Sequence, residues 1–409
     1  MTEKLKGRNF PNLRFKDSNG DEFPHWNMKY GNEIFQNISD KNHDSNLPIL
    51  AITQEYGAIP RDLIDYKISV TDKSIESYKV VQKGDFIISL RSFQGGIEYS
   101  EYKGICSPAY IILRPSIVID NIFYKYYLKT PKYITHLNRK LEGIRDGKMI
   151  SYKYFSDITL PLPSLEEQNK ISIFLSLIET RIHTQRKIIE DLMVLKNNVV
   201  KKLFENKLKF KNGDEDFQKW EKKRLTEISK EHLNKNPENL YAEVFSVSKH
   251  KGVINQIEHL GRSFSAKDIK HYKVVYPGDL VYTKSPTSEF PFGIIKQNRT
   301  GRIGVVSPLY CVFTPQTFEL GYLLHEYFNS SVNTYNYLNP LVQKGAKNTM
   351  NINNETFLNG AKLLLPIDKM EQTHIYTALS LLDDKIDVEE RILLKYENQK
   401  KYLLANLFI

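Results

Sequence analysis

The segment Tyr-Lys-Val-Val-Gln-Lys-Gly-Asp at residues 78–85 determines the fold prediction, because a second version of it, Tyr-Lys-Val-Val-Tyr-Pro-Gly-Asp, occupies residues 272–279. In both versions, apolar runs lie on either side of a Gly-Asp pair. This pattern predicts two strands joined by a tight turn, so we expect a β-hairpin in each copy. The two copies begin at residues 78 and 272, so a repeat is present, and it predicts a chain built from two similar units.

Further landmarks follow each predicted hairpin in the same order. Ser-Pro-Ala-Tyr at residues 107–110 and Ser-Pro-Leu-Tyr at residues 307–310 each lead into a short apolar run that ends at a proline. Such a run predicts another strand. Aromatic stretches with apolar spacing near three and four come next, at residues 123–137 and 322–338, and predict helix. Each unit therefore mixes strands and helix.

Matching segments also precede each predicted hairpin. Leu-Arg-Phe-Lys at residues 13–16 is followed by Trp26, and Leu-Lys-Phe-Lys at residues 208–211 is followed by Trp220. These are the only two tryptophans in the chain. The duplication therefore extends over most of the sequence.

Each unit is followed by a segment that predicts a long helix. A proline-bounded strand, Leu-Pro-Leu-Pro at residues 160–163 or Leu-Leu-Leu-Pro at residues 363–366, precedes a Glu-Gln pair. Beyond that pair, no Pro or Gly occurs as far as Leu208 in the first copy, or through the rest of the sequence in the second. Uninterrupted helix is the natural prediction for both segments.

Positions spaced four and three residues apart form a seam along both predicted helices. The polar seam positions, Gln185 and Lys196 in one helix and Glu389 and Lys400 in the other, fall at equivalent places, as expected if they fix the register of a coiled coil. Two amphipathic helices, each packed on its own domain, remain an alternative. The predicted pairing residues are Ile178, Ile182, Ile189, Leu192, Val199, Leu203, Leu382, Ile386, Leu393, Tyr396, Leu403 and Leu407.

The order of these segments constrains the architecture. The first helix begins where one unit ends and finishes where the next begins, so the second helix can pair with it only by running antiparallel. A helix of roughly forty residues spans about 60 Å. The sequence therefore predicts an α+β protein with two tandem mixed units, separated by two antiparallel coiled-coil helices in pseudo-two-fold symmetry. The predicted boundaries are residues 1–160, 161–207, 208–362 and 363–409, for unit, helix, unit and helix.

Composition favours a polyanionic partner. The chain has 409 residues, a formal net charge of +10 at pH 7 and a pI near 9.1, and a basic balance of this kind suits nucleic acid. The two cysteines, Cys106 and Cys311, lack metal-ligand spacing, so we expect no metal site and a reducing, cytoplasmic location. No long apolar run predicts a membrane span.

The sequence contains no recognisable catalytic motif. Nucleotide-binding loops of the G-x-x-x-x-G-K-[ST] type, zinc-protease H-E-x-x-H and hydrolase G-x-S-x-G patterns are all missing. The Ser-Pro-x-Tyr turns lack the second proline of the loop with which amino-methyltransferases hold a flipped base. Two alternatives remain open: a stand-alone DNA methyltransferase or nuclease with unrecognised motifs, and a coiled-coil scaffold that does not bind DNA.

The duplicated plan resembles the specificity subunit of type I restriction-modification systems. The features that carry the resemblance are the Tyr-Lys-Val-Val-x-x-Gly-Asp segments, the Ser-Pro-x-Tyr turns and Leu-Pro-x-x-x-Glu-Gln at residues 162–168, leading into a long helix. The second copy, at residues 365–372, has one extra residue before Glu-Gln. The resemblance covers nearly the whole chain.

The resemblance implies a non-catalytic, cytoplasmic DNA-binding subunit with two target recognition domains, each for one part of a bipartite, asymmetric site. It also implies that the helices dock two methyltransferase subunits and that motor-nuclease subunits join the complex. Double-stranded DNA would be the ligand and no membrane would be involved. S-adenosylmethionine and ATP would be bound by the partner subunits, and no cofactor by this chain.

Residue type and placement suggest which side chains contact DNA. Two polar loops in each unit, one after the predicted hairpin and one before the proline-bounded strand, carry groups that hydrogen-bond base edges or phosphates. Ordinary solvated loops are the alternative for any single residue. The predicted DNA-binding residues are Arg91, Ser92, Gln94, Arg145, Lys148, Ser151, Tyr152, Lys153, Lys284, Ser285, Thr287, Lys344, Lys347, Asn348 and Thr349.

Overall fold

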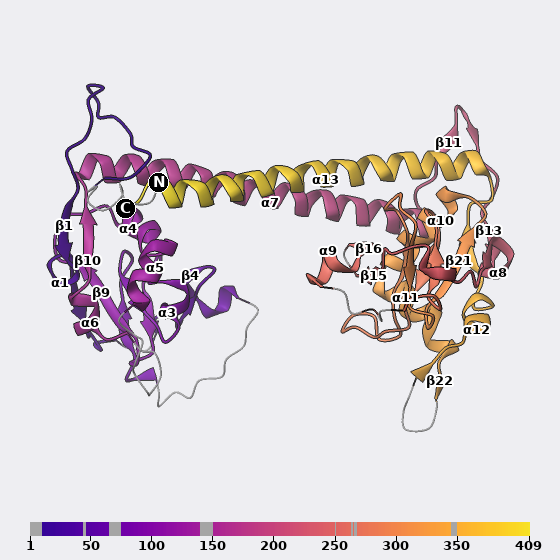
Figure 1. The fold of residues 1–409 in the computed structure, drawn as a ribbon, viewed down its shortest axis with the longest axis horizontal. Coiled ribbons are helices and arrows are strands. Elements are labelled where there is room, and N and C mark those ends of the chain that lie inside the picture. The colour runs from indigo at the N-terminus through magenta and orange to yellow at the C-terminus, as the bar shows by residue number, and fades with distance from the viewer. Residues whose placement is uncertain are drawn as a thin grey trace. The chain divides into compact units, whose positions relative to one another are not determined.

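The computed structural model describes residues 10–43, 46–64, 75–139, 150–249, 251–262, 265, 268–344 and 350–409 (Figure 1). The chain divides into two compact units. Unit 1 comprises Met1–Lys187 together with Glu390–Ile409, and unit 2 comprises Ile188–Glu389. Each unit therefore contains a mixed globular part and one half of each long helix.

Unit 1 is built around a four-stranded antiparallel sheet with strand order β2-β9-β6-β7. Three further antiparallel pairs, β3-β4, β5-β8 and β1-β10, complete its strands. The strands are β1 (Asn27–Tyr30), β2 (Phe35–Ile38), β3 (Leu50–Thr53), β4 (Gly57–Pro60), β5 (Lys79–Val81), β6 (Phe86–Ile88), β7 (Glu98–Tyr99), β8 (Gly104–Cys106), β9 (Ile111–Pro115) and β10 (Thr159–Leu162). The shorter helices are α1 (Gly31–Ile34), α3 (Ser92–Gly95), α4 (Asn121–Tyr127), α5 (Pro131–Asn138) and α6 (Tyr152–Ser156).

Unit 2 repeats this topology, with the sheet order β14-β21-β18-β19 and the pairs β15-β16, β17-β20 and β13-β24. Its strands are β11 (Lys211–Asn212), β12 (Glu215–Asp216), β13 (Glu221–Lys223), β14 (Ser229–Glu231), β15 (Phe245–Ser248), β16 (Gly252–Asn255), β17 (Lys273–Val275), β18 (Leu280–Tyr282), β19 (Ile295–Gln297), β20 (Gly304–Val306), β21 (Cys311–Pro315), β22 (Gln343–Lys344), β23 (Met350–Asn351) and β24 (Leu363–Leu365). Its shorter helices are α8 (Leu225–Ile228), α9 (Gln256–Leu260), α10 (Phe318–Asn329), α11 (Ser331–Leu338) and α12 (Asn354–Leu358).

The β-hairpin predicted around each Gly-Asp pair is wrong. The two strands beside the first pair, β5 and β6, do not bond to each other: β5 pairs with β8, and β6 pairs with β9 and β7. Asp85 explains this, because its carboxylate accepts a bond from Gln82 N (2.7 Å) and two from the Arg114 guanidinium (both 2.7 Å). The turn thus passes the chain from one strand pair into the central sheet.

The aromatic stretches after each sheet form two helices rather than one. In unit 1, Thr130 caps α5 by accepting a bond from Tyr133 N, and Pro131 occupies the first turn. In unit 2, Ser330 caps α11 in the same way, accepting from Asn333 N. Both breaks follow the preference of Ser and Thr for the N-cap position.

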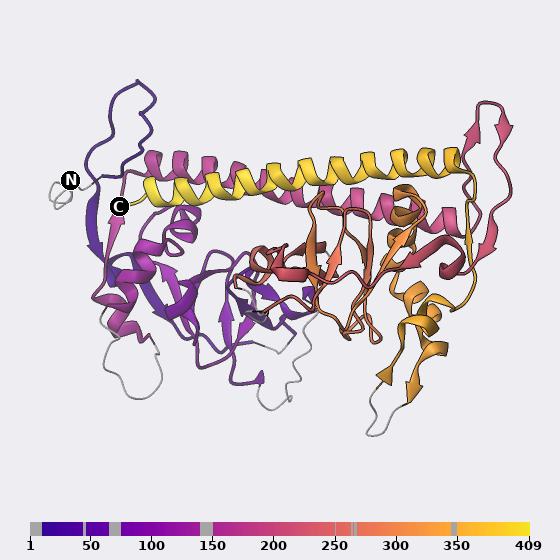
Figure 2. The same cartoon turned by 45° about the vertical axis from the view of Figure 1, so that its right-hand side comes forward.

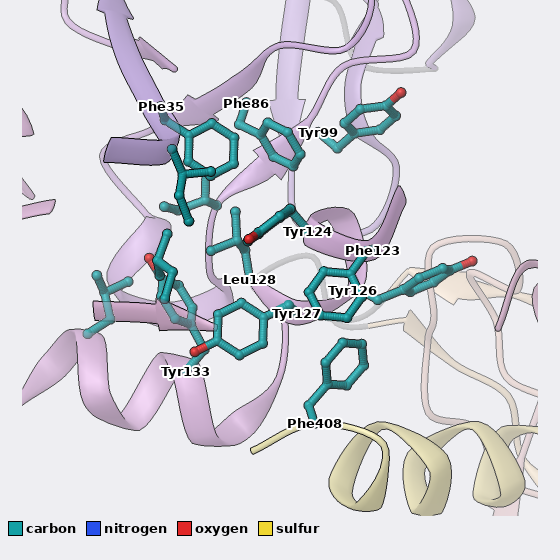
Figure 3. Close-up of a cluster of buried hydrophobic side chains, with 14 of the residues drawn as sticks. Phe35, Phe86, Tyr99, Phe123, Tyr124, Tyr126, Tyr127, Leu128, Tyr133 and Phe408 are labelled. Atoms are coloured by element: carbon teal, nitrogen blue, oxygen red, sulfur yellow. The ribbon is translucent and has the colours of Figure 1, made fainter. Parts of the chain in front are cut away.

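Aromatic side chains fill the core of unit 1. Phe35 from β2 packs edge-on against Phe86 of β6 and Tyr124 of α4, with ring centroids 5.2 and 5.3 Å apart. Phe408, beyond the end of the last helix, packs against Phe123 at 5.2 Å (Figure 3). The C-terminal residues are therefore part of this core.

The two long helices, α7 (Leu165–Phe204) and α13 (Lys369–Asn406), pair antiparallel within each unit (Figures 1 and 2). In unit 1, Glu179 of α7 bonds Lys400 (2.7 Å), and Arg186 farther along α7 bonds Glu397 (2.7 Å). In unit 2, Lys196 bonds Asp383 (2.6 Å). As the residue numbers rise along α7 from 179 to 196, the numbers of their partners on α13 fall from 400 to 383, which confirms the predicted antiparallel arrangement.

The predicted seam residues lie on the inner side of these helices. All are buried or half-buried, and Ile178, Ile182, Leu403 and Leu407 join the main core of unit 1. Leu203 joins a second cluster in unit 2, with Val199 and Leu382 packed against it. The buried members are Ile178, Ile182, Ile189, Leu203, Ile386, Leu403 and Leu407. The half-buried members are Leu192, Val199, Leu382, Leu393 and Tyr396.

Candidate DNA interface

The first predicted DNA-binding loop of unit 1 lies at α3, directly after strand β6. Arg91 and Gln94 are exposed there, so their side chains are available to a ligand. Ser92 differs, because it is only 1% exposed and its hydroxyl accepts a bond from Ser89 N (2.9 Å). In this structure the Ser92 hydroxyl stabilises the turn, and its role in DNA binding stays a prediction.

The second predicted loop of unit 1 is described only from Ser151 onward, since Arg145 and Lys148 lie outside the described residues. The Ser151 hydroxyl caps α6 by accepting a bond from Tyr154 N (3.1 Å). Tyr152 donates its hydroxyl to Phe35 O (2.9 Å), so it is held against the core. Lys153 is exposed. Within this group, Lys153 is the side chain best placed to meet a phosphate.

In unit 2 the corresponding loop follows β18. Lys284 is half-buried, and its backbone φ of 60° lies in the left-handed region that residues other than Gly rarely adopt. Burial lowers the pKa of its ammonium group. Ser285 and Thr287 are exposed, and Thr287 also accepts a bond from Phe290 N through its hydroxyl (3.2 Å). Strained residues of this kind cluster at functional sites.

The remaining predicted residues of unit 2 belong to the β22-β23 segment. Lys344 lies in strand β22, but its side chain is outside the described part of the structure. Lys347, Asn348 and Thr349 also lie outside the described residues. Their role in DNA binding stays a prediction.

In unit 1, the end of α5 contacts the predicted DNA-binding loop at α3. Asn138, at the end of α5, donates its amide to Phe93 O in α3 (2.6 Å). This bond holds the end of α5 against the loop that carries Arg91 and Gln94. Strand pairing and helix position create this juxtaposition, and no local sequence pattern predicts it.

The Leu-Pro-x-x-x-Glu-Gln motif is a structural junction. Gln168 donates its amide to Pro163 O (2.9 Å) and accepts a bond from Asp120 N (2.9 Å), at the cap of α4. Gln372 likewise donates to Pro366 O (3.0 Å) and accepts a bond from the Thr317 hydroxyl (2.7 Å), at the cap of α10. In each unit this glutamine ties the proline-bounded strand, the long helix and the aromatic helix together.

The Tyr-Lys-Val-Val and Ser-Pro-x-Tyr motifs also contact each other in both units. Lys79 donates its ammonium to Tyr110 O (2.7 Å), and Lys273 donates to Tyr310 O (2.7 Å). These motifs therefore shape the framework from which the loops project.

No candidate metal or membrane site appears in the ranges that the structure describes. Within those ranges, no three His, Cys, Asp or Glu side chains are grouped as a metal would require, and no helix is both long and apolar enough to cross a bilayer. Cys106 and Cys311 are buried, and burial raises the pKa of each thiol to about 12. Both thiols are therefore unreactive at neutral pH.

Comparison with solved structures identifies the fold. An S subunit of a type I restriction-modification system from M. genitalium is 15% identical, with a TM-score of 0.53 over 98% of this chain and 99% of that chain. A chain from work on complex assembly and conformational transition of the type I R-M system is also 15% identical, with a TM-score of 0.50 over 94% of this chain and 97% of that chain. The protein thus has the tandem fold of these specificity subunits, as predicted.

Sequence comparison gives the family. Residues 26–192 match the model of the type I restriction modification DNA specificity domain. In Methanocaldococcus jannaschii, the MjaVIII specificity subunit of a type I restriction enzyme is 30% identical over 34% of this chain and 31% of its own length. The MjaIX specificity subunit is 24% identical over 56% of this chain and 59% of its own length. The chain thus spans less than two thirds of these relatives. Residues 26–192 form a domain of this specificity family, which confirms the resemblance.

Proposed function

We propose that this protein is the DNA specificity subunit of a type I restriction-modification complex and that it binds a bipartite, asymmetric target. The observation that carries this proposal is the duplication itself. The same strand topology occurs in both units, while the loops after β6 and β18 differ in sequence: Arg-Ser-Phe-Gln at residues 91–94 and Lys-Ser-Pro-Thr at residues 284–287. A shared framework with different polar loops suits two different half-sites.

In this proposal the chemistry belongs to partner subunits. Two methyltransferase subunits carry S-adenosylmethionine, and motor-nuclease subunits use ATP, while this chain supplies sequence recognition without catalysis. The family of residues 26–192 supports this division of roles, because its description is a DNA specificity domain.

The outer faces of the long helices are the proposed docking surface. Large apolar side chains stay exposed there, including Ile173 (62%) and Leu177 (57%) on α7 and Leu381 (63%) and Leu394 (57%) on α13. On α7, Ile173 and Leu177 are four residues apart and share one helix face, and exposed apolar groups that lie together in this way are typical of protein–protein contact sites. Leu177→Asp is expected to weaken retention of a methyltransferase subunit in pull-down experiments and to leave the fold intact.

The test is methylation mapping in host cells with and without this gene. We expect a bipartite methylated motif that appears only when the gene is present. Replacing residues 1–160 with the matching segment of a relative should change one part of that motif and leave the other unchanged. If both parts change together, the units do not bind independent half-sites.

A second measurement tests the absence of catalysis. The purified chain is incubated with DNA and S-adenosylmethionine without partners, and methyl transfer to DNA is measured. The expected result is no transfer. Transfer by the chain alone would overturn the assignment and favour a stand-alone methyltransferase.

A further inference from the structure

In unit 1, the tip of the β3-β4 hairpin carries three polar residues that lie outside the predicted DNA-binding loops. Gln54, Glu55 and Tyr56 are all exposed, and Tyr56 has 61% of its surface accessible. Thr53 fixes the tip, because its hydroxyl accepts a bond from Tyr56 N (2.9 Å) and donates to Gly57 O (3.1 Å). A large aromatic side chain is thus held outward on an ordered turn.

This hairpin tip contacts the predicted DNA-binding loop at α3. The Gln54 amide donates to Arg91 O (3.4 Å), and Lys129 donates to Gln54 O (3.3 Å). The Gln54 side chain also packs on Gly95, where an added Cβ would lie 2.6 Å from Gln54 Cδ. Tip and loop therefore form one continuous polar edge with Arg91 and Gln94.

Unit 2 has the same juxtaposition with different chemistry. At the tip of the β15-β16 hairpin, Lys249 forms an ion pair with Glu289, in the segment after β18. Lys251, at the same tip, is exposed, and its backbone N donates to the Ser248 hydroxyl (3.4 Å). This tip carries lysines where the tip of unit 1 carries Gln, Glu and Tyr.

We infer that the two hairpin tips are additional DNA-contacting elements, with the tip of unit 1 contacting bases and the tip of unit 2 contacting phosphates. The inference rests on the proposed function. Gln donates and accepts at adenine, Glu accepts from cytosine N4, and Tyr offers a hydroxyl and a ring, whereas Lys near a backbone neutralises phosphate. The tip of unit 1 therefore contributes to sequence preference, and that of unit 2 to affinity.

The full-length chain is used to select sequences from a pool of randomised duplexes. Gln54→Ala and Tyr56→Ala should each relax preference at one or two positions of the first half-site. The expected loss is about 5-fold to 150-fold in discrimination, and the second half-site should stay unchanged. Gly95→Ala should reproduce the Gln54→Ala effect, because its Cβ displaces the Gln54 side chain.

Lys251→Ala is the matched variant in unit 2. It should weaken binding to all sequences alike and reduce the slope of log affinity against log salt by about 1. Melting temperatures equal to wild type verify that each variant is folded. If the wild-type chain selects a bipartite site and both Gln54→Ala and Tyr56→Ala keep the wild-type sequence preference, the inference about the hairpin tips is wrong and the proposed function still stands. If wild type selects no bipartite site, the proposed function fails instead.

Discussion

The two units anchor the start of their long helices differently, although the same sequence landmarks build both anchors. In unit 1, the Glu167 side chain is fully buried and both of its oxygens are paired: Arg14 donates to both (2.7 and 2.8 Å), and Trp26 donates to Oε2 (2.9 Å). Arg14 also donates to Phe23 O (2.6 Å). The segment that precedes β1 is thereby clamped to α7 through a neutralised carboxylate.

In unit 2, the corresponding clamp is incomplete. Trp220 donates to Glu371 Oε1 (2.9 Å), but the buried Glu371 Oε2 has no hydrogen-bond partner among the residues that the structure describes. Lys209, which matches Arg14 in the repeat, is exposed. Burial raises the pKa of Glu371, and the bond from Trp220 and the charge of Lys209 offset this rise only in part. A duplicated motif has therefore kept its tryptophan contact and lost its ion pair.

For the lysines of the helix seam, the difference between the units is reversed: the lysine of unit 2 has more carboxylate partners than the lysine of unit 1. Lys196, in unit 2, is 8% exposed and bonds two carboxylates, Glu326 (2.7 Å) and Asp383 (2.6 Å). Lys400, in unit 1, bonds one carboxylate in the described part of the chain, that of Glu179 (2.7 Å), and both side chains are partly exposed. Unit 2 therefore depends more on its seam lysine, and unit 1 more on its clamp.

The largest expected effect is that of Lys196→Met. Removing the ammonium leaves the buried Glu326 and the half-buried Asp383 with less compensation, and such a change costs about 3 to 5 kcal/mol. Lys400→Met should cost about 1 kcal/mol, because its site is open to solvent. Urea unfolding followed by hydrogen exchange in each unit measures both losses. Equal losses would show that the two seam lysines are equivalent.

Glu167→Gln should have the next largest effect. It leaves the Arg14 guanidinium without its charge partner and removes a bidentate pair, with an expected loss of about 2 to 3 kcal/mol. Glu371→Gln keeps an acceptor for Trp220 and removes a carboxylate charge that burial disfavours, so at neutral pH it should cause no loss and a small gain. The two variants are compared by the urea concentration at half-unfolding. A larger loss in Glu371→Gln contradicts the proposed difference between the clamps.

Local patterns predicted the repeat, the strands after each Ser-Pro-x-Tyr turn and the two long helices, because their signals lie in adjacent residues. Strand pairing depends on distant contacts instead. The bond between Asp85, in the turn before β6, and Arg114, in β9, joins residues with no shared local motif. For this reason the hairpin prediction was wrong although both of its strands exist.

The candidate interface was harder to predict than the fold. Residue type suggested Ser92 as a DNA contact, but burial of its hydroxyl becomes evident only when the turn at α3 is built. Gln54 was missed because its contact with Arg91 depends on the placement of two separate strand pairs. The signal available in the sequence was a polar segment, Gln-Glu-Tyr at residues 54–56, between the two short apolar runs that form β3 and β4.

A pH series tests the incomplete clamp further. Because burial raises the pKa of Glu371 above its ordinary value of 4.5, the folded protein holds this proton more tightly than the unfolded chain does. Its contribution to stability is therefore full below that value and is lost as the pH rises through the raised pKa. Glu371→Gln should flatten this part of the stability profile, whereas Glu167→Gln should leave it in place. A profile unchanged by Glu371→Gln would assign the titration to another group.

The smallest expected effect comes from completing the clamp with Lys209→Arg. A guanidinium at this position provides the planar, two-pronged donor that Arg14 provides in unit 1, and it reaches both oxygens of Glu371 where an ammonium presents a point charge. The expected gain is about 1 kcal/mol at neutral pH, with a smaller gain at acid pH, where Glu371 is protonated. Arg14→Lys is the reciprocal change and should destabilise unit 1 alone. Paired measurements of half-unfolding at neutral and acid pH test both variants. If Lys209→Arg gives the same small shift at both values, the new side chain packs on the surface without engaging the carboxylate, and Glu371 anchors α13 through its tryptophan contact without an ion pair.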